Sequence, residues 1–129
     1  MKASFKSLIT AAQKARRHAF APCSHYKVGA AVLCEKGKIV VGCNVENSQF
    51  LPVGTCAEVT ALHGARAQGF KTFQTLAIVS ENGVGPCGKC REVIWDHNPK
   101  MELVLVDTRG KAQTVRIADL LPLKFAKVF

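Results

Sequence analysis

Two cysteine motifs, each at the start of an expected helix, most constrain how this chain can fold. Residues 55–58 read Thr-Cys-Ala-Glu, and residues 86–90 read Pro-Cys-Gly-Lys-Cys. Helical composition follows each motif, over residues 56–68 and 88–97. The unpaired N–H groups and the dipole of a helix N-terminus lower a thiol pKa and favour the thiolate. A fold in which the two N-termini meet would therefore gather the thiolates of Cys56, Cys87 and Cys90.

Each motif alone has a second interpretation. The C-x-x-C spacing of Cys87 and Cys90 is shared by thioredoxin-like redox sites and by zinc sites, although a redox pair is expected earlier in the chain. Thr55 with Glu58 three residues later also fits a capping box, a purely structural feature. The six cysteines of the 129-residue chain could instead form a disulfide framework, but 48% apolar residues build a core without such cross-links.

The two motifs together favour a catalytic zinc site. Three cysteine ligands suit tetrahedral zinc and leave its fourth position open to water. Glu58 lies two residues from Cys56 and can point at that water without binding the metal. The order C-x-E and then P-C-x-x-C is the three-cysteine form of the zinc nucleobase deaminase signature. A non-catalytic zinc module would need a fourth protein ligand, such as Cys34 or Cys43.

The rest of the chain predicts an α/β domain with helices packed on a mixed sheet. Apolar residues at helical spacing from Phe5 to Ala19 predict a first helix that stops before Pro22. Residues 28–34 and 39–43 predict a hairpin, and apolar runs predict strands at 75–80, 103–106 and, more weakly, 114–117. The chain shows no internal repeat or linker, so we expect a single domain over residues 1–129.

Four segments carry a family resemblance: residues 28–31 (Val-Gly-Ala-Ala), 42–47 (Gly-Cys-Asn-Val-Glu-Asn), 56–58 and 86–91. On these segments the sequence resembles the small, homotetrameric cytidine deaminases, and the match runs along almost the whole chain, from residues 19–24 to residues 120–122. The resemblance implies a cytidine-deaminase-like three-layer sandwich, with a mixed five-stranded sheet and helices on both faces. It also implies zinc-dependent hydrolysis of cytidine or 2′-deoxycytidine to uridine or 2′-deoxyuridine and ammonia, in pyrimidine salvage.

The family resemblance also implies roles for individual residues. Glu58 is the catalytic proton carrier, and Cys56, Cys87 and Cys90 hold Zn²⁺. Asn44 and Glu46 bind the ribose, Tyr26 packs by the sugar, and the backbone around Ala57 holds the pyrimidine. Phe125 stacks on the base in a neighbouring subunit of a homotetramer. From the residues alone, Asn44 would be a turn residue, Tyr26 a core residue and Phe125 an apolar anchor of the tail.

Two departures from the family pattern bear on activity. Val59 stands where the family usually has an arginine that donates to the thiolates. Blasticidin S deaminases, which share the zinc motifs, also lack this arginine. The loop after Glu46 is one residue longer than usual. His63, seven residues after Cys56 on the same helix face, is a further candidate for a role beside the ligands. Because Val59 matches the blasticidin S deaminases, deamination of a nucleoside antibiotic of this type remains an alternative.

The net charge of +9 raises polynucleotide deamination as another alternative. The lysines and arginines are scattered, however, which favours a solvated basic surface and a free nucleoside substrate over nucleic acid. No apolar run approaches the ~20 residues of a membrane span, and the N-terminus lacks the pattern of a secretory signal. We therefore expect a cytoplasmic protein with no membrane partner.

Overall fold

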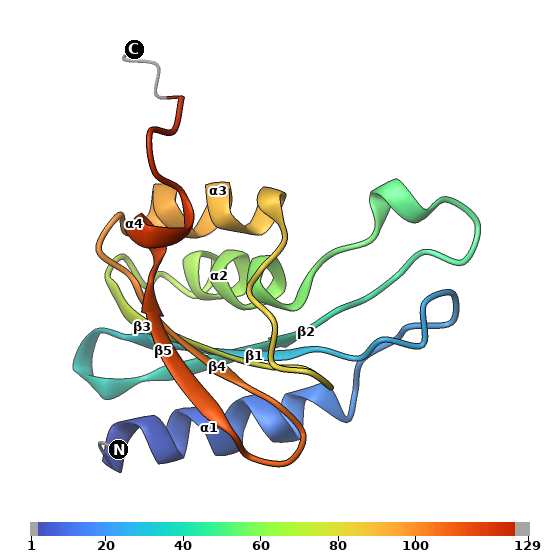
Figure 1. Ribbon diagram of the computed structural model, residues 1–129, viewed down its shortest axis with the longest axis horizontal. Helices are drawn as coiled ribbons and strands as arrows, with labels where there is room; N and C mark the ends of the chain where they lie inside the picture. The colour runs from blue at the N-terminus through green and yellow to red at the C-terminus, as the bar shows by residue number, and fades with distance from the viewer. Residues whose placement is uncertain (1–2, 126–129) are drawn as a thin grey trace.

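The computed structural model describes residues 3–125 and contains a five-stranded mixed sheet between two layers of helices (Figure 1). The strand order is β2-β1-β3-β4-β5. The strands are β1 (Gly29–Cys34), β2 (Ile39–Cys43), β3 (Phe73–Val79), β4 (Glu102–Val106) and β5 (Ala112–Arg116). The helices are α1 (Ala3–Arg16), α2 (Ala57–Ala67), α3 (Gly88–His97) and α4 (Ile117–Leu120), with 3-10 turns η1 (Glu35–Gly37) and η2 (Leu51–Val53).

Alternation along the strands divides the core into two layers. Because successive side chains of a strand point to opposite faces, one face of the sheet packs on α1 and the other on α2 and α3. Leu8 and Ala12 of α1 contact the first face, together with Ala31, Ala77 and Val104. The second layer joins the sheet to the two other helices through the following residues: Ala30, Val32, Leu76, Ile78, Leu103, Leu62 and Ile94. The three-layer sandwich predicted from the sequence is confirmed.

The strand pairing places several connecting segments at the same end of the sheet. β1 is antiparallel to both β2 and β3, with Gly29 opposite Cys43 on one side and Val79 on the other. β3 and β4 are parallel and are joined through α3, the crossover that a parallel pair requires. The segments that follow β2 and β3, and the one that precedes β1, therefore start from the same end of the sheet.

The first helix ends earlier than predicted, at Arg16, and Ala19 lies outside it. The N–H groups of Arg17, His18 and Ala19 each bond to the carbonyl three residues earlier, so the helix tightens into a turn. Phe20 then forms a β-bridge with Val45. That long-range pairing takes the backbone out of the helix before Pro22, and the sequence contains no local signal for it.

The structure adds one short helix and corrects one cap. Residues 117–120 form α4, whereas we predicted a strand continuing to Ile117. The capping box at Thr55 is not formed, because α2 begins at Ala57 with Cys56 as its N-cap and no side chain caps it. Thr55 instead exchanges two backbone hydrogen bonds with Val45, at 2.8 and 2.9 Å. No helix between residues 3 and 125 is both long and apolar enough to cross a lipid bilayer.

Candidate active site

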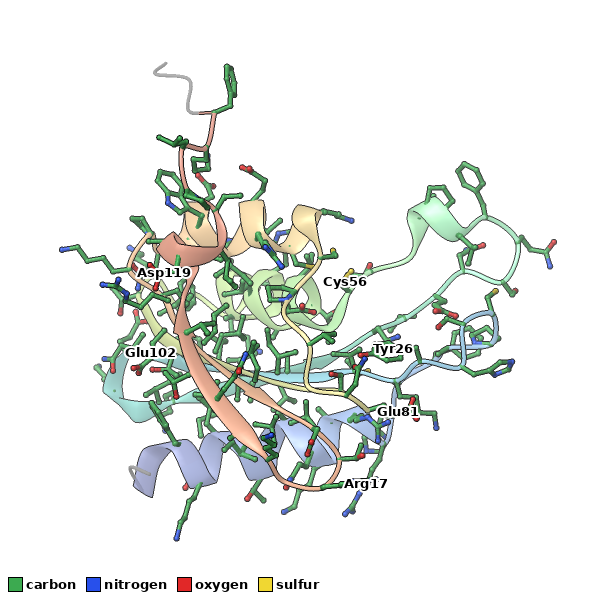
Figure 2. All side chains as sticks on the ribbon, in the orientation of Figure 1. Arg17, Tyr26, Cys56, Glu81, Glu102 and Asp119 are labelled. Atoms are coloured by element: carbon green, nitrogen blue, oxygen red, sulfur yellow. The ribbon has the colours of Figure 1, made fainter. Side chains whose placement is uncertain are left out.

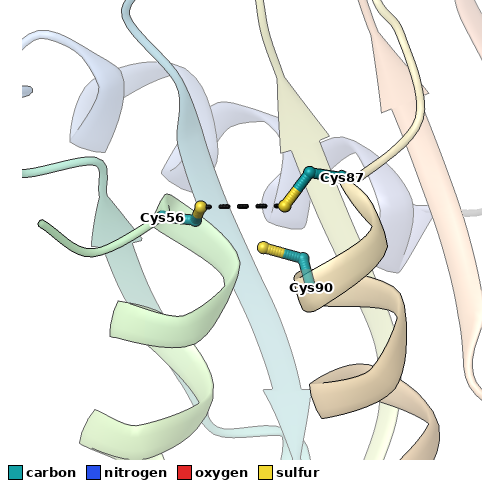
Figure 3. Close-up of side chains that lie close together, drawn as sticks. All are labelled: Cys56, Cys87 and Cys90. Atoms are coloured by element: carbon teal, nitrogen blue, oxygen red, sulfur yellow. Dashed lines mark hydrogen bonds between the residues drawn. The ribbon is translucent and has the colours of Figure 1, made fainter. Parts of the chain in front are cut away.

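Three cysteines meet where the N-termini of α2 and α3 converge (Figure 3). Cys56 and Cys87 are the N-cap residues of the two helices, and Cys90 lies in the first turn of α3. Their Sγ atoms all lie within 4.8 Å of one another, and those of Cys56 and Cys87 are 4.0 Å apart. Neither N-cap thiol bonds to its own helix, so both remain available to a common partner.

The sulfur separations suit one tetrahedral ion. Zn–S bonds of about 2.3 Å place neighbouring sulfurs about 3.8 Å apart, close to the observed 4.0 Å. All six cysteines are free thiols, so the disulfide framework considered from the sequence is wrong. Among the described residues the cluster contains no fourth protein ligand, and Cys34 and Cys43 are not part of it. The three thiols therefore fit Zn²⁺ with one coordination position left over.

The surroundings of the Cys56 thiol lower its pKa. Hydrogen bonds from the Cys90 and Cys87 thiols, together with the positive charge of Lys89, lower the pKa of Cys56 to about 6 although burial opposes the shift. The pKa of Cys90 is raised, because its thiol donates to Cys56 and is buried. The thiolate is therefore favoured on Cys56 over Cys90, at the N-terminus of α2, where the helix dipole also favours it.

Glu58 lies beside the cluster and is almost completely buried, with 5% of its surface exposed. Burial raises the pKa of Glu58 to about 7, and the nearby charge of Cys56 adds to the shift. A carboxyl group with a pKa near neutrality can both accept and release a proton under ordinary conditions, as a general acid–base catalyst must.

A cavity of about 340 Å³ opens in front of these groups, within the size range of small-molecule sites. Cys56, Ala57, Glu58 and Cys87 form one wall. The predicted substrate residues Tyr26, Asn44 and Glu46 line the same cavity, and Tyr26 lies at the same end of the sheet as Cys56 (Figure 2). The other lining residues are Ser24, Val28, Ile78, Ser80, Val84, Gly85 and Pro86.

The polar residues of the cavity are held by backbone contacts. The Asn44 amide accepts from the N–H of Val28 and donates to the carbonyl of Tyr26, both at 2.8 Å. Glu46 accepts from the backbone N–H groups of Cys23 and Ser24, at 3.0 and 3.1 Å, and from the Ser24 hydroxyl. These hydrogen bonds, that of the hydroxyl above all, lower the pKa of Glu46. Glu46 is therefore an ionised acceptor at neutral pH.

Two candidate residues lie away from this cavity. Phe125, at the end of the described chain, is 82% exposed and does not line the cavity of its own chain. The ring of His63 packs edge-on at 5.9 Å from that of His97, which ends α3 far along the helix from the ligands. The structure therefore does not support a role for His63 beside the sulfurs.

Within residues 3–125, no arginine donates a hydrogen bond to the three thiols in place of the one that the family usually has at position 59. Val59 is buried in the core layer between α2 and the sheet. Arg91, directly after a ligand, donates from Nε to the Pro86 carbonyl at 2.8 Å and from Nη1 to the Leu120 carbonyl at 3.1 Å. It thus fixes the loop that carries Cys87 and ties it to α4. Sequence reasoning did not assign this structural role, and the charge of Lys89 on Cys56 was likewise missed.

Comparison with known proteins agrees with this geometry. Residues 3–106 match the family model of the cytidine and deoxycytidylate deaminase zinc-binding region. The chain belongs to this family. Its resident metal is zinc, and the three-thiol cluster fits that ion.

Relatives in the deaminase family cover most of the chain. A cytidine deaminase of Sporosarcina psychrophila is 42% identical over 95% of this chain and 91% of its own. The crystal structure of cytidine deaminase from Burkholderia pseudomallei superposes with a TM-score of 0.89 at 41% identity, over 97% of this chain and 100% of that one. A blasticidin-S deaminase of Bacillus cereus is 34% identical over 79% of each chain.

Proposed function

We propose that this protein is a cytidine deaminase, which hydrolyses cytidine and 2′-deoxycytidine to uridine and 2′-deoxyuridine with release of ammonia. The observation that carries the proposal is the convergence of three thiols beside a buried carboxyl at the wall of a nucleoside-sized cavity. The relatives named cytidine deaminase, at up to 42% identity, support the same substrate. Residues 1–129 form one catalytic domain in this proposal.

In the proposed site, Cys56, Cys87 and Cys90 hold the zinc ion. Zinc bound there supplies a Lewis acid that activates water near neutral pH. Three thiolates and Zn²⁺ leave a net charge of −1, which weakens the Lewis acid unless nearby dipoles or cations offset it. The two helix N-termini and Lys89 are the sources of positive potential in this chain.

Glu58 moves the protons in the proposed reaction. It accepts a proton from the attacking water and delivers it to N3 of the cytosine ring, while the water oxygen bonds to C4. It then accepts the remaining proton from the hydroxyl now on C4 and delivers it to the departing amine, so that the C4 carbonyl forms, one water is consumed and one ammonia is released. The pKa of Glu58, raised to about 7 by burial, matches this double role.

The polar wall of the cavity binds the sugar in this proposal. Glu46 accepts three hydrogen bonds from the protein, and an ionised carboxylate has about four acceptor sites, so it can still accept from a ribose hydroxyl. Asn44 retains one N–H and one lone pair for the same ligand. The Tyr26 ring packs by the sugar, and the backbone at Ala57 contacts the pyrimidine.

The assembly proposed for the active enzyme is a homotetramer. Phe125 can stack on a base only in a neighbouring subunit, because it does not line the cavity of its own chain. Phe50, Leu51 and Val53 are also exposed on the loop before Cys56, where a subunit contact would bury them. We further propose a role in pyrimidine salvage in the cytoplasm, with no nucleic-acid or membrane partner.

A second candidate substrate is a nucleoside antibiotic of the blasticidin S type. Val59 favours it, because blasticidin S deaminases also lack the arginine after the catalytic glutamate, and the Bacillus cereus relative carries that name. Asn44 and Glu46, both directed to the cavity, favour an unmodified ribose instead.

A deamination panel tests these proposals. Cytidine, deoxycytidine, cytosine, blasticidin S and short single-stranded oligonucleotides are compared on protein of measured zinc content. We expect the two nucleosides to be the best substrates, with a KM for cytidine that does not depend on salt. Comparable turnover of oligonucleotides, or a preference for blasticidin S, would refute the assignment.

The variant Glu58→Gln tests the mechanism within the same panel. We expect it to retain its zinc and to lose several orders of magnitude in kcat, because Gln cannot carry a proton. Near-normal turnover by this variant would rule out the role proposed for Glu58.

A further inference from the structure

A hydrogen bond links two loops beside the cavity. The hydroxyl of Tyr26, between α1 and β1, donates to the Oδ1 atom of Asn82, which follows β3. Tyr26 lines the cavity, whereas Asn82 does not. The side chain of Asn82 therefore reaches the cavity through its hydrogen bond to the tyrosine.

The two linked loops carry different parts of the site. The loop of Tyr26 includes Ser24, which binds Glu46 on the polar wall. The loop of Asn82 continues through Val84, Gly85 and Pro86, all in the cavity lining, to the ligand Cys87. The hydrogen bond thus joins the sugar side of the cavity to its metal side.

Both backbones are fixed where the bond is made. Tyr26 donates its N–H to the Ser24 hydroxyl at 3.0 Å and accepts from the Asn44 amide at 2.8 Å. Beside Asn82, the N–H of Gly83 donates to the Ser80 hydroxyl at 3.0 Å, and Gly83 has a φ of +65° that glycine adopts without strain. With the backbones fixed, the main remaining freedom of Tyr26 is rotation of its side chain, which the bond to Asn82 restricts.

We propose that Asn82 is a positioning residue that holds the Tyr26 ring in its binding orientation before the nucleoside arrives. This rests on the proposed function, because it assumes that the ring packs by the sugar. A ring already in place loses less conformational freedom on binding, so the bond strengthens binding without taking part in the proton transfers. A neutral, partly exposed hydrogen bond of this kind corresponds to about a two- to tenfold effect on KM.

Kinetics of four variants and one control variant test the proposal. Asn82→Ala and Tyr26→Phe should each raise the KM for cytidine about two- to tenfold, with kcat within about twofold of the parent. The double variant should be no worse than either single one, because both remove the same bond. Asn82→Asp keeps an Oδ1 acceptor and should restore the KM. The control Gln74→Ala removes another exposed amide, at the opposite end of β3, and should change nothing.

A spectroscopic readout makes the test independent of activity. Tyr26 is the only tyrosine of the chain, so incorporation of 3-fluorotyrosine gives a single labelled site for fluorine NMR. Asn82→Ala should shift the fluorine resonance, because the freed side chain averages over several orientations. Gln74→Ala should leave the resonance at its position in the parent. KM effects that multiply in the double variant, or a fluorine signal unchanged by Asn82→Ala, would overturn the proposal. A parent inactive on cytidine would refute the proposed function instead, and the fluorine signal would still decide whether Asn82 holds Tyr26.

Discussion

Gly42 sets how closely β2 approaches the helix that begins at the metal site. A Cβ atom at this position would lie 2.5 Å from the backbone nitrogen of Ala61 and 2.7 Å from the carbonyl oxygen of Ala57. Both are backbone atoms of α2, so no side-chain rotation relieves the clash. Gly42→Ala must therefore move α2, which carries Glu58 and begins directly after Cys56.

Gly64 offers a matched control on the same pair of elements. It lies inside α2, and the nearest atom to an added Cβ is Cγ1 of Val40 at 3.9 Å, an ordinary contact distance. The same substitution at Gly64 therefore introduces no clash. Replacing glycine by alanine inside a helix removes backbone entropy from the unfolded chain and stabilises the fold by about 0.5–1 kcal/mol.

The two substitutions should change stability in opposite directions. Overpacking in a close-packed interior costs about 1–3 kcal/mol, and Gly42→Ala should reach the upper end because the clashing atoms are backbone. With a urea m-value of about 2 kcal/mol/M, its unfolding midpoint should fall by ~1–1.5 M, whereas that of Gly64→Ala should rise by ~0.3–0.5 M. The measurement uses zinc-loaded protein at one fixed concentration.

Activity provides the second readout of the Gly42 prediction. A displaced α2 moves Cys56 and Glu58 relative to the ligands on α3, so Gly42→Ala should also lower both zinc content and kcat. Gly64→Ala should retain both. If the two variants had the same midpoint as the parent, or if Gly42→Ala lost stability with its zinc and kcat intact, β2 would not position the site through this contact.

Two further predictions concern regions outside the cavity. Glu35 accepts hydrogen bonds from the N–H groups of Lys71 and Thr72 at 3.0–3.1 Å, and these lower its pKa to about 2. Because this pKa lies below the value of about 4.3 in unfolded chains, the carboxylate stabilises the fold above that pH and loses its effect as the pH falls towards 2. Glu35→Gln should therefore lower the urea midpoint at pH 6, and its difference from the parent should shrink between pH 4.3 and 2; a difference independent of pH would contradict this. Lys124 is only 13% exposed, with Nζ 3.3 Å from Glu92 Oε1 and 4.3 Å from the centre of the Trp95 ring. Lys124→Met should release Lys124 and Phe125 from α3, so the fluorescence of Trp95, the only tryptophan, should shift and chymotrypsin should cleave faster after Phe125. Unchanged fluorescence and cleavage would show that Lys124 does not hold these two residues on α3.

Local patterns in the sequence were sufficient to predict most of the elements. Helix α3 occupies the predicted residues 88–97, and β2 the predicted residues 39–43. Glycine and proline at the ends and a regular apolar spacing determine such segments over a few residues. Elements that depend on distant contacts were missed or misplaced, as at the end of α1, where Phe20 pairs with Val45, and at α4, whose Leu120 carbonyl binds Arg91.

The sequence by itself also predicted which residues would form the metal site. Few kinds of site place cysteine and glutamate together at two helix N-termini. This combination indicated Cys56, Cys87, Cys90 and Glu58. Motif spacing predicts such a set because each half of it is local. Spacing along the chain cannot state how far apart the two halves lie, since that depends on how α2 and α3 pack on the sheet.

Only the tertiary structure decided the environment of these residues. The burial that raises the pKa of Glu58, the hydrogen bond of Arg91 to the Leu120 carbonyl, and the bond between Tyr26 and Asn82 all depend on segments that are distant in sequence. Desolvation and hydrogen bonding depend on what surrounds a group in space, and a linear sequence records only its neighbours along the chain. The residue types therefore predicted the chemistry of the site, while the packing of the fold set the pKa values and hydrogen bonds of those residues.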